Sequence, residues 1–273
     1  MMGSSVSSSL KNLRLRYRSM VLRAALGALR RQSLCSFHRR IVPLRNYCPM
    51  VSFAFDDFPR TAYTIGGSIL RHFGVNGTYY VSAGLMNTCN HLGEQFRAED
   101  LHSLLADGHE LASHTFSHIS PRAVSLAAFQ NDVRKGEQAI RETTGLVPSG
   151  NFAYPFGEVT LGAKRALSKE MASCRGIYAG VNGPNLDLGL LRANGLYGGV
   201  DQSASVEALI NKNEMLKGWL IFYTHDVRNN PSPFGCTPEL FERALSRAIR
   251  GGSQVLTVAS VVNGLSHSTH LPR

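Results

Sequence analysis

Two adjacent carboxylates, Asp56 and Asp57, follow directly on an apolar, aromatic-rich run over residues 50–55. The run has the length and composition of a buried strand, and Pro59 cannot continue a central strand. Side chains of adjacent residues at a strand end point in different directions, so the two carboxylates can take different roles. An ordinary pair of solvated loop acids is the alternative. We interpret the pair as chemical groups that a strand delivers to one edge of a sheet.

His114 and His118 follow a second strand-like run, residues 109–113. Imidazoles four residues apart reach one metal ion if the backbone between them turns helically. Together with one carboxylate they form a His₂-carboxylate set with open positions, as catalytic zinc sites have. Two unrelated surface histidines would give the same spacing. Because both motifs follow predicted strands, and the carboxyl ends of parallel strands share one face, we expect a metal site there.

Two further strand ends carry candidate groups. A predicted strand at residues 151–154 ends in the run Pro155-Phe156-Gly157, which suits a loop that presents backbone N–H groups to a ligand. An ordinary turn is the alternative for this run. The most hydrophobic strand, residues 219–223, is followed by His225, which is either a hydrogen-bonded edge residue or a group facing the metal.

The elements that must position these groups alternate along the chain. Strand patterns are expected at residues 50–55, 77–82, 109–113, 151–154, 176–179, 219–223 and 254–258. Helical patterns lie between them, at residues 61–73, 98–106, 122–144, 161–172 and 205–216 and from residue 237. Such alternation predicts parallel strands with helices outside, either a barrel or an open doubly wound sheet. With no internal repeat or linker, residues 50–265 are predicted to be one domain.

The formal net charge of +10 belongs to one end of the chain. Residues 1–49 contain ten of the 29 basic residues and no acid, which leaves 19 basic residues against all 19 acidic ones. This Ser- and Arg-rich segment is expected to be a basic, disordered extension, or an organelle transit peptide, and a nucleic-acid-binding role ranks below both. The protein is therefore placed in the cytoplasm, with organelle targeting as the alternative.

The cysteines and the apolar runs argue against two classes of protein, secreted disulfide scaffolds and membrane-spanning proteins. The five cysteines form no C-x-x-C pair and are odd in number, which favours reduced thiols over a secreted disulfide scaffold. No run of residues is apolar and long enough to predict a membrane span. The oligomeric state is not predicted.

At this point four motifs can be read together: FAFDD ending at Asp57, SHTFSH ending at His118, FAYPFG ending at Gly157, and FYTHD ending at Asp226. In this order they resemble the polysaccharide deacetylases of carbohydrate esterase family 4, which include the rhizobial chitooligosaccharide deacetylase. The resemblance covers roughly residues 50–260. It implies a distorted (β/α) barrel that binds one divalent metal ion, usually zinc.

The resemblance also implies roles for individual residues. The general base would be Asp56 and the general acid His225; the metal ligands would be Asp57, His114 and His118; Tyr154 and the backbone amide of Phe156 would lie at the oxyanion and substrate; and Thr115 would brace the loop between the ligands.

The chain departs from the family pattern at two points. Phe152 stands where many members carry an arginine that contacts the base, and Arg192 is our candidate for supplying that charge. The family's aspartate that tunes the acid histidine has no clear counterpart, and Asp187 and Asp226 are the candidates.

The expected function is metal-dependent hydrolysis of the N-acetyl group from N-acetylglucosamine units of a chitooligosaccharide or related polysaccharide. The enzyme class is a hydrolase of non-peptide carbon–nitrogen bonds. Two alternatives remain: an amidohydrolase of the same fold acting on a small non-carbohydrate amide, and a carbohydrate-binding relative that has lost catalysis.

Overall fold

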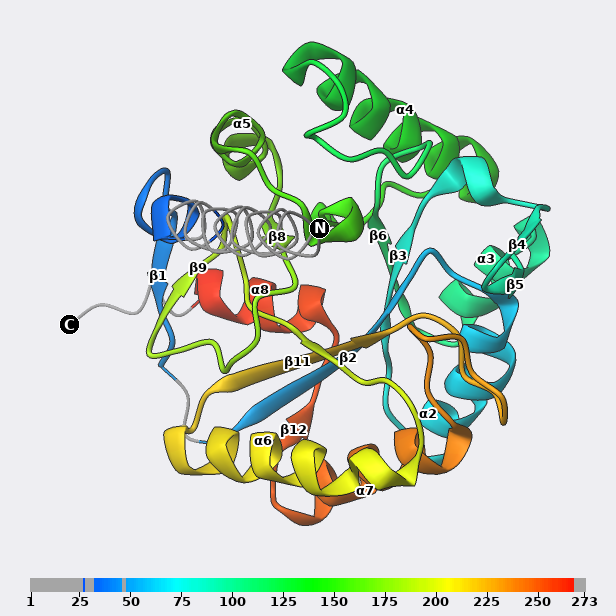
Figure 1. Ribbon diagram of the computed structural model, residues 1–273, viewed down its shortest axis with the longest axis vertical. Coiled ribbons are helices and arrows are strands. Elements are labelled where there is room, and N and C mark those ends of the chain that lie inside the picture. Colours follow the sequence, from blue (N-terminus) through cyan, green and yellow to red (C-terminus); the bar gives the residue numbers. More distant parts are fainter. Residues whose placement is uncertain (1–26, 28–31, 46–47, 268–273) are drawn as a thin grey trace, which may run out of the picture.

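The computed structural model describes residues 27, 32–45 and 48–267 of the 273-residue chain. Its main sheet has eight strands, all paired in parallel, with the order β10-β11-β2-β3-β6-β7-β8 and β12 added beside β2 (Figure 1). The strands are β2 (Met50–Asp56), β3 (Thr78–Val81), β6 (Glu110–Ser113), β7 (Asn151–Ala153), β8 (Ser173–Arg175), β10 (Asn194–Gly195), β11 (Trp219–Thr224) and β12 (Gln254–Val255).

The sheet curls into an incomplete barrel. Its end strands β8 and β10 are not paired with each other, and the segment between them returns to β8 through a bridge from Leu191 to Arg175. Within this segment Leu191 N donates to Cys174 O (2.8 Å) and Gly176 N donates to Leu191 O (3.1 Å). The single-domain, distorted (β/α) barrel predicted from the sequence is thereby confirmed.

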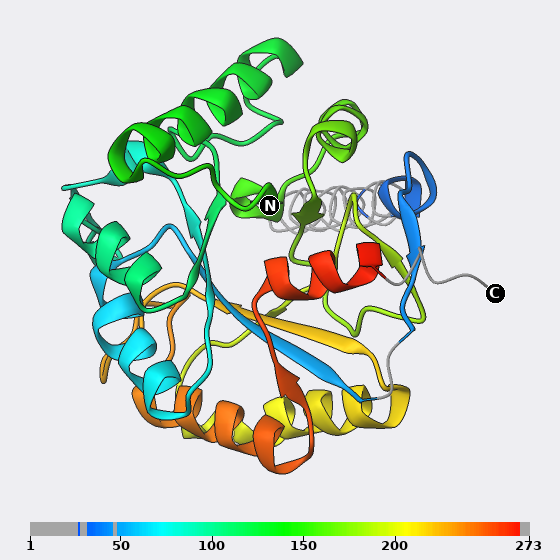
Figure 2. The same cartoon turned by 180° about the vertical axis from the view of Figure 1, so that it is seen from behind.

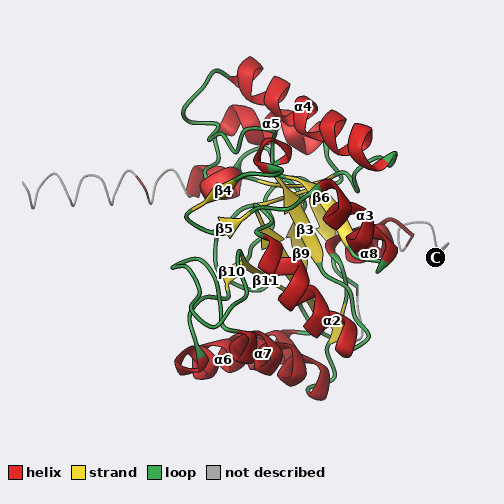
Figure 3. Cartoon of the chain, turned by 90° about the vertical axis from the view of Figure 1, so that its right-hand side faces the viewer, coloured by secondary structure: helices red, strands yellow, loops and turns green. Residues whose placement is uncertain are grey.

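Helices cover the outside of the sheet. They are α2 (Ser68–His72, preceded by the π-helix η1, Ala62–Gly67), α3 (Ala98–Ala106), α4 (Leu126–Thr144), α5 (Leu161–Glu170), α6 (Ser203–Leu216), α7 (Pro238–Arg250) and α8 (Val258–His267). Figure 3 shows α4 and α5 on one side of the sheet and α6 and α7 on the opposite side. Ser125, Thr160 and Thr237 each cap a helix by accepting from the backbone three residues on.

The central strand β2 explains why its sequence is a continuous apolar run. All seven of its residues are buried, as expected for a parallel strand covered on both faces. Phe53 and Phe55 pack outward against Phe241 of α7, with ring centroids 5.3 and 5.5 Å away. Ala54 faces the opposite way, in a cluster that combines small alanines with large rings such as Trp219. This alternation fills the barrel interior.

Helix α8 covers the amino ends of the strands, as the view of the molecule from behind shows (Figure 2). Val258 N donates to Thr78 Oγ1 at the start of β3 (2.9 Å), and Ala259 N donates to Glu110 Oε2 at the start of β6 (2.8 Å). The carboxyl ends of the strands remain as the place for an open site. Our sequence pattern at residues 254–258 predicted a strand, but only its first two residues form β12 before α8 begins.

The prediction of a strand at residues 176–179 was wrong. The strand lies earlier, at β8, where Asn151 pairs with Ser173 and Ala153 with Arg175. A run of Ser, Cys and Arg does not resemble a buried strand, yet all three residues are buried. Arg175 lies inside the barrel because it has a charged partner there, which no local pattern shows.

The described part of the segment that we expected to be a separate extension packs on the domain. β1 (Ile41–Pro43) pairs antiparallel with β9 (Asn185–Asp187), and Leu34 is 2% exposed. The buried Lys164 donates from Nζ to Leu34 O (2.6 Å) and to Asp187 Oδ2 (2.6 Å). The packed unit therefore begins before residue 50. Residues 1–26 and 28–31 lie outside the described residues.

Arg40 fastens this segment to the end of α5, and its loss should be measurable. Its guanidinium donates to the carbonyls of Ser168 (2.8 Å), Met171 (2.7 Å) and Ala172. Because unpaired carbonyls would remain, Arg40→Ala should lower the free energy of unfolding in urea by about 1–3 kcal/mol. The exposed neighbour Arg39 is the matched control, and Arg39→Ala should change it by about 0.5 kcal/mol or less. Equal effects of the two variants would contradict this role.

Candidate active site

Loops at the carboxyl ends of β2, β6, β7 and β11 bring the candidate groups into one cleft of about 490 Å³. The cleft is of the size that small ligands occupy in proteins. It contains most of the residues singled out from the sequence. Its lining includes Asp56, Asp57, His114, His118, Phe156 and His225.

Three of these side chains converge on one point. His118 Nε2 lies 3.1 Å and His114 Nε2 lies 3.5 Å from Asp57 Oδ1. His114 Nδ1 is 2.8 Å from the carbonyl oxygen of Ala153, which can only accept, so Nδ1 carries the proton and Nε2 presents a lone pair. Asp57 Oδ1 is buried and has no hydrogen-bond partner among the described residues. Acceptor atoms that face one another in this way fit a cation between them.

The protonation states of His114, His118 and Asp57 also fit a cation site. Burial lowers the pKa of His114 to about 3 and that of His118 to about 4, so both imidazoles are neutral near pH 7. Burial, and then the neighbouring Asp56 carboxylate, raises the pKa of Asp57 to about 7. Neutral imidazoles and an uncompensated carboxylate form the donor set that a divalent ion takes up.

The backbone at the site is held in a rarely populated conformation. Of the eight described non-glycine residues with positive φ, five lie here: Asp57, Phe58, Thr115, His118 and Phe156, with φ between 52° and 68°. Non-glycine residues pay for this conformation, and they keep it only where their surroundings impose it. The loops around the cleft are therefore braced from outside.

The loop between the two histidines is braced by α4. Asp132 accepts hydrogen bonds from Phe116 N (3.1 Å), Ser117 N (2.9 Å) and Ser117 Oγ (3.0 Å). A Cβ at Gly136 would lie 2.7 Å from the carbonyl of Thr115, so only glycine allows the loop to lie this close to the helix. The hydroxyl of Thr115 has no hydrogen-bond partner among the described residues, so the brace that we assigned to it comes from Asp132.

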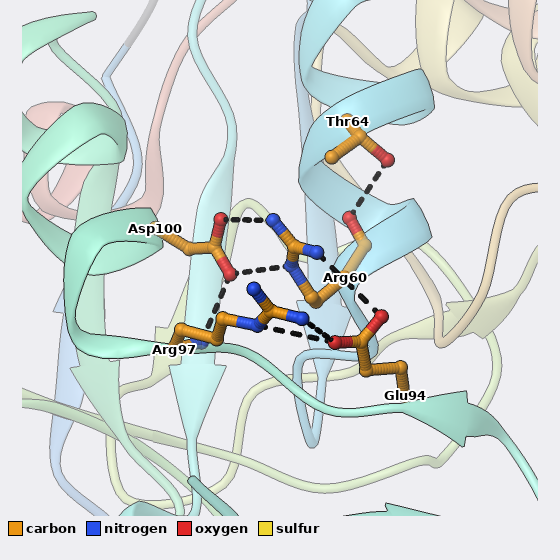
Figure 4. A network of polar contacts seen from close by, with 5 residues as sticks. All are labelled: Arg60, Thr64, Glu94, Arg97 and Asp100. Carbon is orange, nitrogen blue, oxygen red and sulfur yellow. Dashed lines mark hydrogen bonds and ion pairs between the residues drawn. The ribbon is translucent and has the colours of Figure 1, made fainter. Parts of the chain in front are cut away.

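The loop that follows Asp57 is braced by a network of side chains (Figure 4). Arg60 donates to Asp100 through Nε (2.8 Å) and Nη2 (3.1 Å), and its Nη1 lies 3.5 Å from Glu94. Asp100 also accepts from the backbone N–H of Arg97 (2.9 Å), which caps α3. One carboxylate thus ties the start of α3 to the exit of β2.

The charge beside Asp56 comes from Arg175, not from Arg192. Arg175 is 1% exposed, pairs with the Asp56 carboxylate, and lies 4.5 Å from the ring centroid of Tyr80. Arg192 instead donates to Ala179 O (3.0 Å) and lines a different cavity. Our assignment of Arg192 was wrong because β7 and β8 pair in register, which brings Arg175 next to the strand where the family's arginine would lie.

Asp56 and Arg175 form a buried ion pair. Burial alone would raise the pKa of Asp56, but the Arg175 guanidinium, with smaller effects of His114 and His225, holds it below its ordinary value. Asp56 is therefore ionised near pH 7. An ionised carboxylate beside a metal site can accept a proton from a bound water molecule.

His225 is oriented by a backbone carbonyl. Its Nδ1 lies 3.1 Å from Phe234 O, and burial lowers its pKa. Neither candidate aspartate bonds the ring in the structure: Asp187 pairs with Lys164 (2.6 Å), and Asp226 pairs with Arg228 (2.7 Å).

Two residues after β7 have different environments. Phe156 is 60% exposed and its ring centroid lies 4.4 Å from that of His118, at the cleft. Tyr154 is 2% exposed and packs beneath the site, with its ring 5.2 Å from Phe152. The prediction that Tyr154 lies at the substrate was therefore wrong: Tyr154 is two residues after Phe152, so both rings point to the same side of the segment, into the buried cluster that includes Phe129 of α4.

The cleft walls include residues that the sequence did not reveal. Most are apolar or aromatic and lie on loops or on a short 3₁₀ helix, where no periodicity marks them: Leu85, Leu92, Ile177, Tyr197 and Phe234. Besides the candidate catalytic groups, the polar lining consists of Asn90, His91 and the two tyrosines Tyr197 and Tyr223.

Comparisons with known proteins identify the fold. Residues 45–172 match the family model of polysaccharide deacetylase. A search of curated proteins gave no match. Among solved structures, the chitin deacetylase of the fungus Colletotrichum lindemuthianum superposes with a TM-score of 0.53 at 19% identity, covering 80% of this chain and 89% of that one.

Two further structures share the fold. A family 4 acetyl xylan esterase from Clostridium thermocellum, in complex with a cobalt ion, gives a TM-score of 0.55 at 19% identity, over 82% of this chain and 93% of that chain. A family 4 pseudoenzyme from Bacillus anthracis gives 0.52 at 13% identity, over 80% and 66%. None of the described helices is long and apolar enough to cross a membrane.

The buried ion pair leads to a stability prediction. Arg175→Met leaves the Asp56 carboxylate buried without a cation and should lower the free energy of unfolding by about 3–5 kcal/mol. Adding Asp56→Asn to Arg175→Met removes that charge and should recover a large part of the loss. Arg192→Met is the control and should change stability by about 0.5 kcal/mol or less. Urea unfolding measures all four proteins, and an Arg175→Met protein as stable as the wild type would contradict the pairing.

Proposed function

We propose that this chain, in which residues 45–172 match the polysaccharide deacetylase model, is a metal-dependent hydrolase that removes the N-acetyl group from N-acetylglucosamine units of a chitooligosaccharide or related polysaccharide. The observation that carries the proposal is the meeting of two differently compensated carboxylates with three histidines in one cleft. The amide bond is broken, acetate is released, and the amine stays on the sugar.

Asp57, His114 and His118 would hold the metal ion. Their ligand atoms all lie within 4.8 Å of one another, and a set of two imidazoles and one carboxylate is characteristic of catalytic zinc. A zinc ion held there would supply Lewis acidity, lowering the pKa of a water molecule and polarising a carbonyl group.

Asp56 would act as the general base. Arg175 keeps its carboxylate ionised, and its position next to Asp57 in the chain puts it beside the metal site without being a ligand. It would take the proton of the attacking water. The backbone N–H of Phe156, at the rim of the cleft, would donate to the acyl oxygen as negative charge develops there.

His225 would act as the general acid. Its Nδ1 proton is committed to Phe234 O, so Nε2 is the atom left to deliver a proton to the leaving amine. The imidazole must be protonated to do this, and burial lowers its pKa. The rate should therefore fall as pH rises through the pKa of His225. It should also fall when the pH is lowered enough to protonate Asp56.

One observation favours a second candidate, hydrolysis of a small non-carbohydrate amide. The walls around the catalytic groups are largely apolar, whereas a sugar chain presents many hydroxyl groups. Acetate release from chitooligosaccharides, peptidoglycan fragments and small N-acetyl amides, measured side by side, separates the two. A carbohydrate-binding protein without catalysis would release acetate from none of them, and the intact set of Asp56, Asp57 and three histidines argues against that reading.

The metal ligands and the base should respond differently to substitution. His114→Ala and His118→Ala should each remove most of the bound zinc. Asp56→Asn should keep the zinc and lose turnover by a factor of about 10²–10⁴, the usual contribution of a general base. Elemental analysis and acetate release measure the two properties. Full zinc occupancy in both histidine variants would overturn the site. Zinc loss in Asp56→Asn, with zinc retained in Asp57→Asn, would mean that the carboxylate roles are reversed.

The acid should be needed for turnover and not for metal. His225→Ala should fold, retain zinc and lose kcat by about 10²–10⁴-fold with little change in KM. The fall in rate on the basic side of the pH profile should disappear with it. His91→Ala, which removes another imidazole of the cleft lining, serves as the control and should keep the profile. Wild-type kcat in the His225→Ala protein would remove His225 from the mechanism.

A further inference from the structure

The orientation of His225 depends on a single carbonyl group. Phe234 O accepts from both the backbone N–H of His225 and its Nδ1, each at 3.1 Å. Because a carbonyl oxygen has no proton to give, Nδ1 must carry one, which leaves Nε2 for the cleft. No described carboxylate bonds the ring, so this carbonyl fixes its tautomer, while the rings of Tyr197 and Phe234 pack beside it, with centroids 6.3 and 5.7 Å away.

The loop that carries Phe234, residues 226–236, is folded around a buried aspartate. Asp226 is fully buried, accepts from Ser232 N (2.9 Å) and from Ser232 Oγ, and forms an ion pair with Arg228, whose Nε lies 2.7 Å away. Ser232 Oγ in turn accepts from Phe234 N (3.2 Å). A chain of hydrogen bonds thus runs from Asp226 through Ser232 Oγ to the backbone N–H of Phe234, and Ser232 O accepts from the N–H of Gly235 (3.0 Å), in the peptide group that contains the Phe234 carbonyl.

The end of the loop that follows Phe234 is also held in place. A Cβ at Gly235 would lie 2.3 Å from Asp226 Oδ1, so the loop closes on the carboxylate only with glycine there. Cys236 N donates to Asp226 O (2.9 Å), and Gly198 N donates to Gly235 O (2.8 Å). Phe234 is therefore held from both sides, and its carbonyl has little freedom to turn away.

We propose that Asp226 and Ser232 are positioning residues for the general acid: they hold the Phe234 carbonyl, which keeps His225 in the Nδ1–H tautomer with Nε2 directed to the leaving amine. The acid role rests on the proposed function, whereas the tautomer does not. A purely structural role for Asp226 is the competing account, in which the loop loses stability but His225 is unaffected.

The charged groups near His225 set the direction of the expected pH effect. Burial lowers the pKa of His225; Asp56 raises it, the hydrogen bond to Phe234 O raises it, Arg175 lowers it and Asp226 raises it. Since the carbonyl favours the protonated ring, loss of that hydrogen bond should lower the pKa of His225 further. The basic limb of the rate profile should then move to lower pH.

The first test needs no turnover. In ¹⁵N-labelled protein, the ring nitrogens of His225, assigned by their absence in His225→Gln, should show the Nδ1–H tautomer in the wild type. Ser232→Ala should shift the tautomer population toward Nε2–H, and Ser232→Thr, which keeps the hydroxyl, should restore it. Asn230→Ala, at an exposed position of the same loop, should match the wild type. An unchanged tautomer in both Ser232→Ala and Asp226→Asn would overturn the proposal.

The second test measures acetate release by proteins shown by elemental analysis to retain zinc. Ser232→Ala and Asp226→Asn should lose about tenfold or more in kcat, with KM changed by no more than about threefold, because the acid contributes to the transition state and not to binding. Ser232→Thr should recover most of the loss. Wild-type kcat in Ser232→Ala would contradict the proposal. If the wild type itself releases no acetate, the proposed function fails, and the tautomer measurement still decides this inference.

Discussion

Two buried carboxylates, side by side at the end of β2, set the main constraint on this structure. Asp56 and Asp57 are each 5% exposed, and like charges so close cannot both stay ionised without cations. Arg175 compensates Asp56 from β8, and Asp57 faces only two neutral imidazoles. In the proposed function this asymmetry separates their roles: Asp56 would be the general base and Asp57 a metal ligand.

The rest of the barrel holds this arrangement against its own strain. Two of the segments with positive φ are fastened to helices outside the sheet: the loop between the two histidines to Asp132 of α4, and the exit of β2 to Asp100 of α3 through Arg60. The loop next to His225 is also braced: Asp226 is bonded inside this loop, and Phe234 O of the same loop lies within hydrogen-bond distance of His225 Nδ1. Rigid elements thus supply the geometry, and loops supply the chemistry.

The groups at strand ends could be predicted from the sequence because the rule involved is local. An apolar run followed by a carboxylate or imidazole places that group at the carboxyl edge of a parallel sheet, and Asp56, His114 and His225 all lie there. Partners that depend on register between strands could not be predicted. Arg175 was missed in favour of Arg192 for this reason, and the packing of residues 32–45 was hidden because Arg40 and Lys164 looked like surface charges.

The central claim is that the two carboxylates are compensated by different cations, Asp56 by Arg175 and Asp57 by a metal ion. A crystal structure of the zinc-loaded protein tests this claim most directly. The account predicts one zinc ion about 2.0–2.2 Å from a carboxylate oxygen of Asp57 and from Nε2 of His114 and His118. Asp56 should remain paired with Arg175 and outside the coordination sphere. A zinc ion bridging Asp56 and Asp57, or one bound without the two histidines, would contradict it.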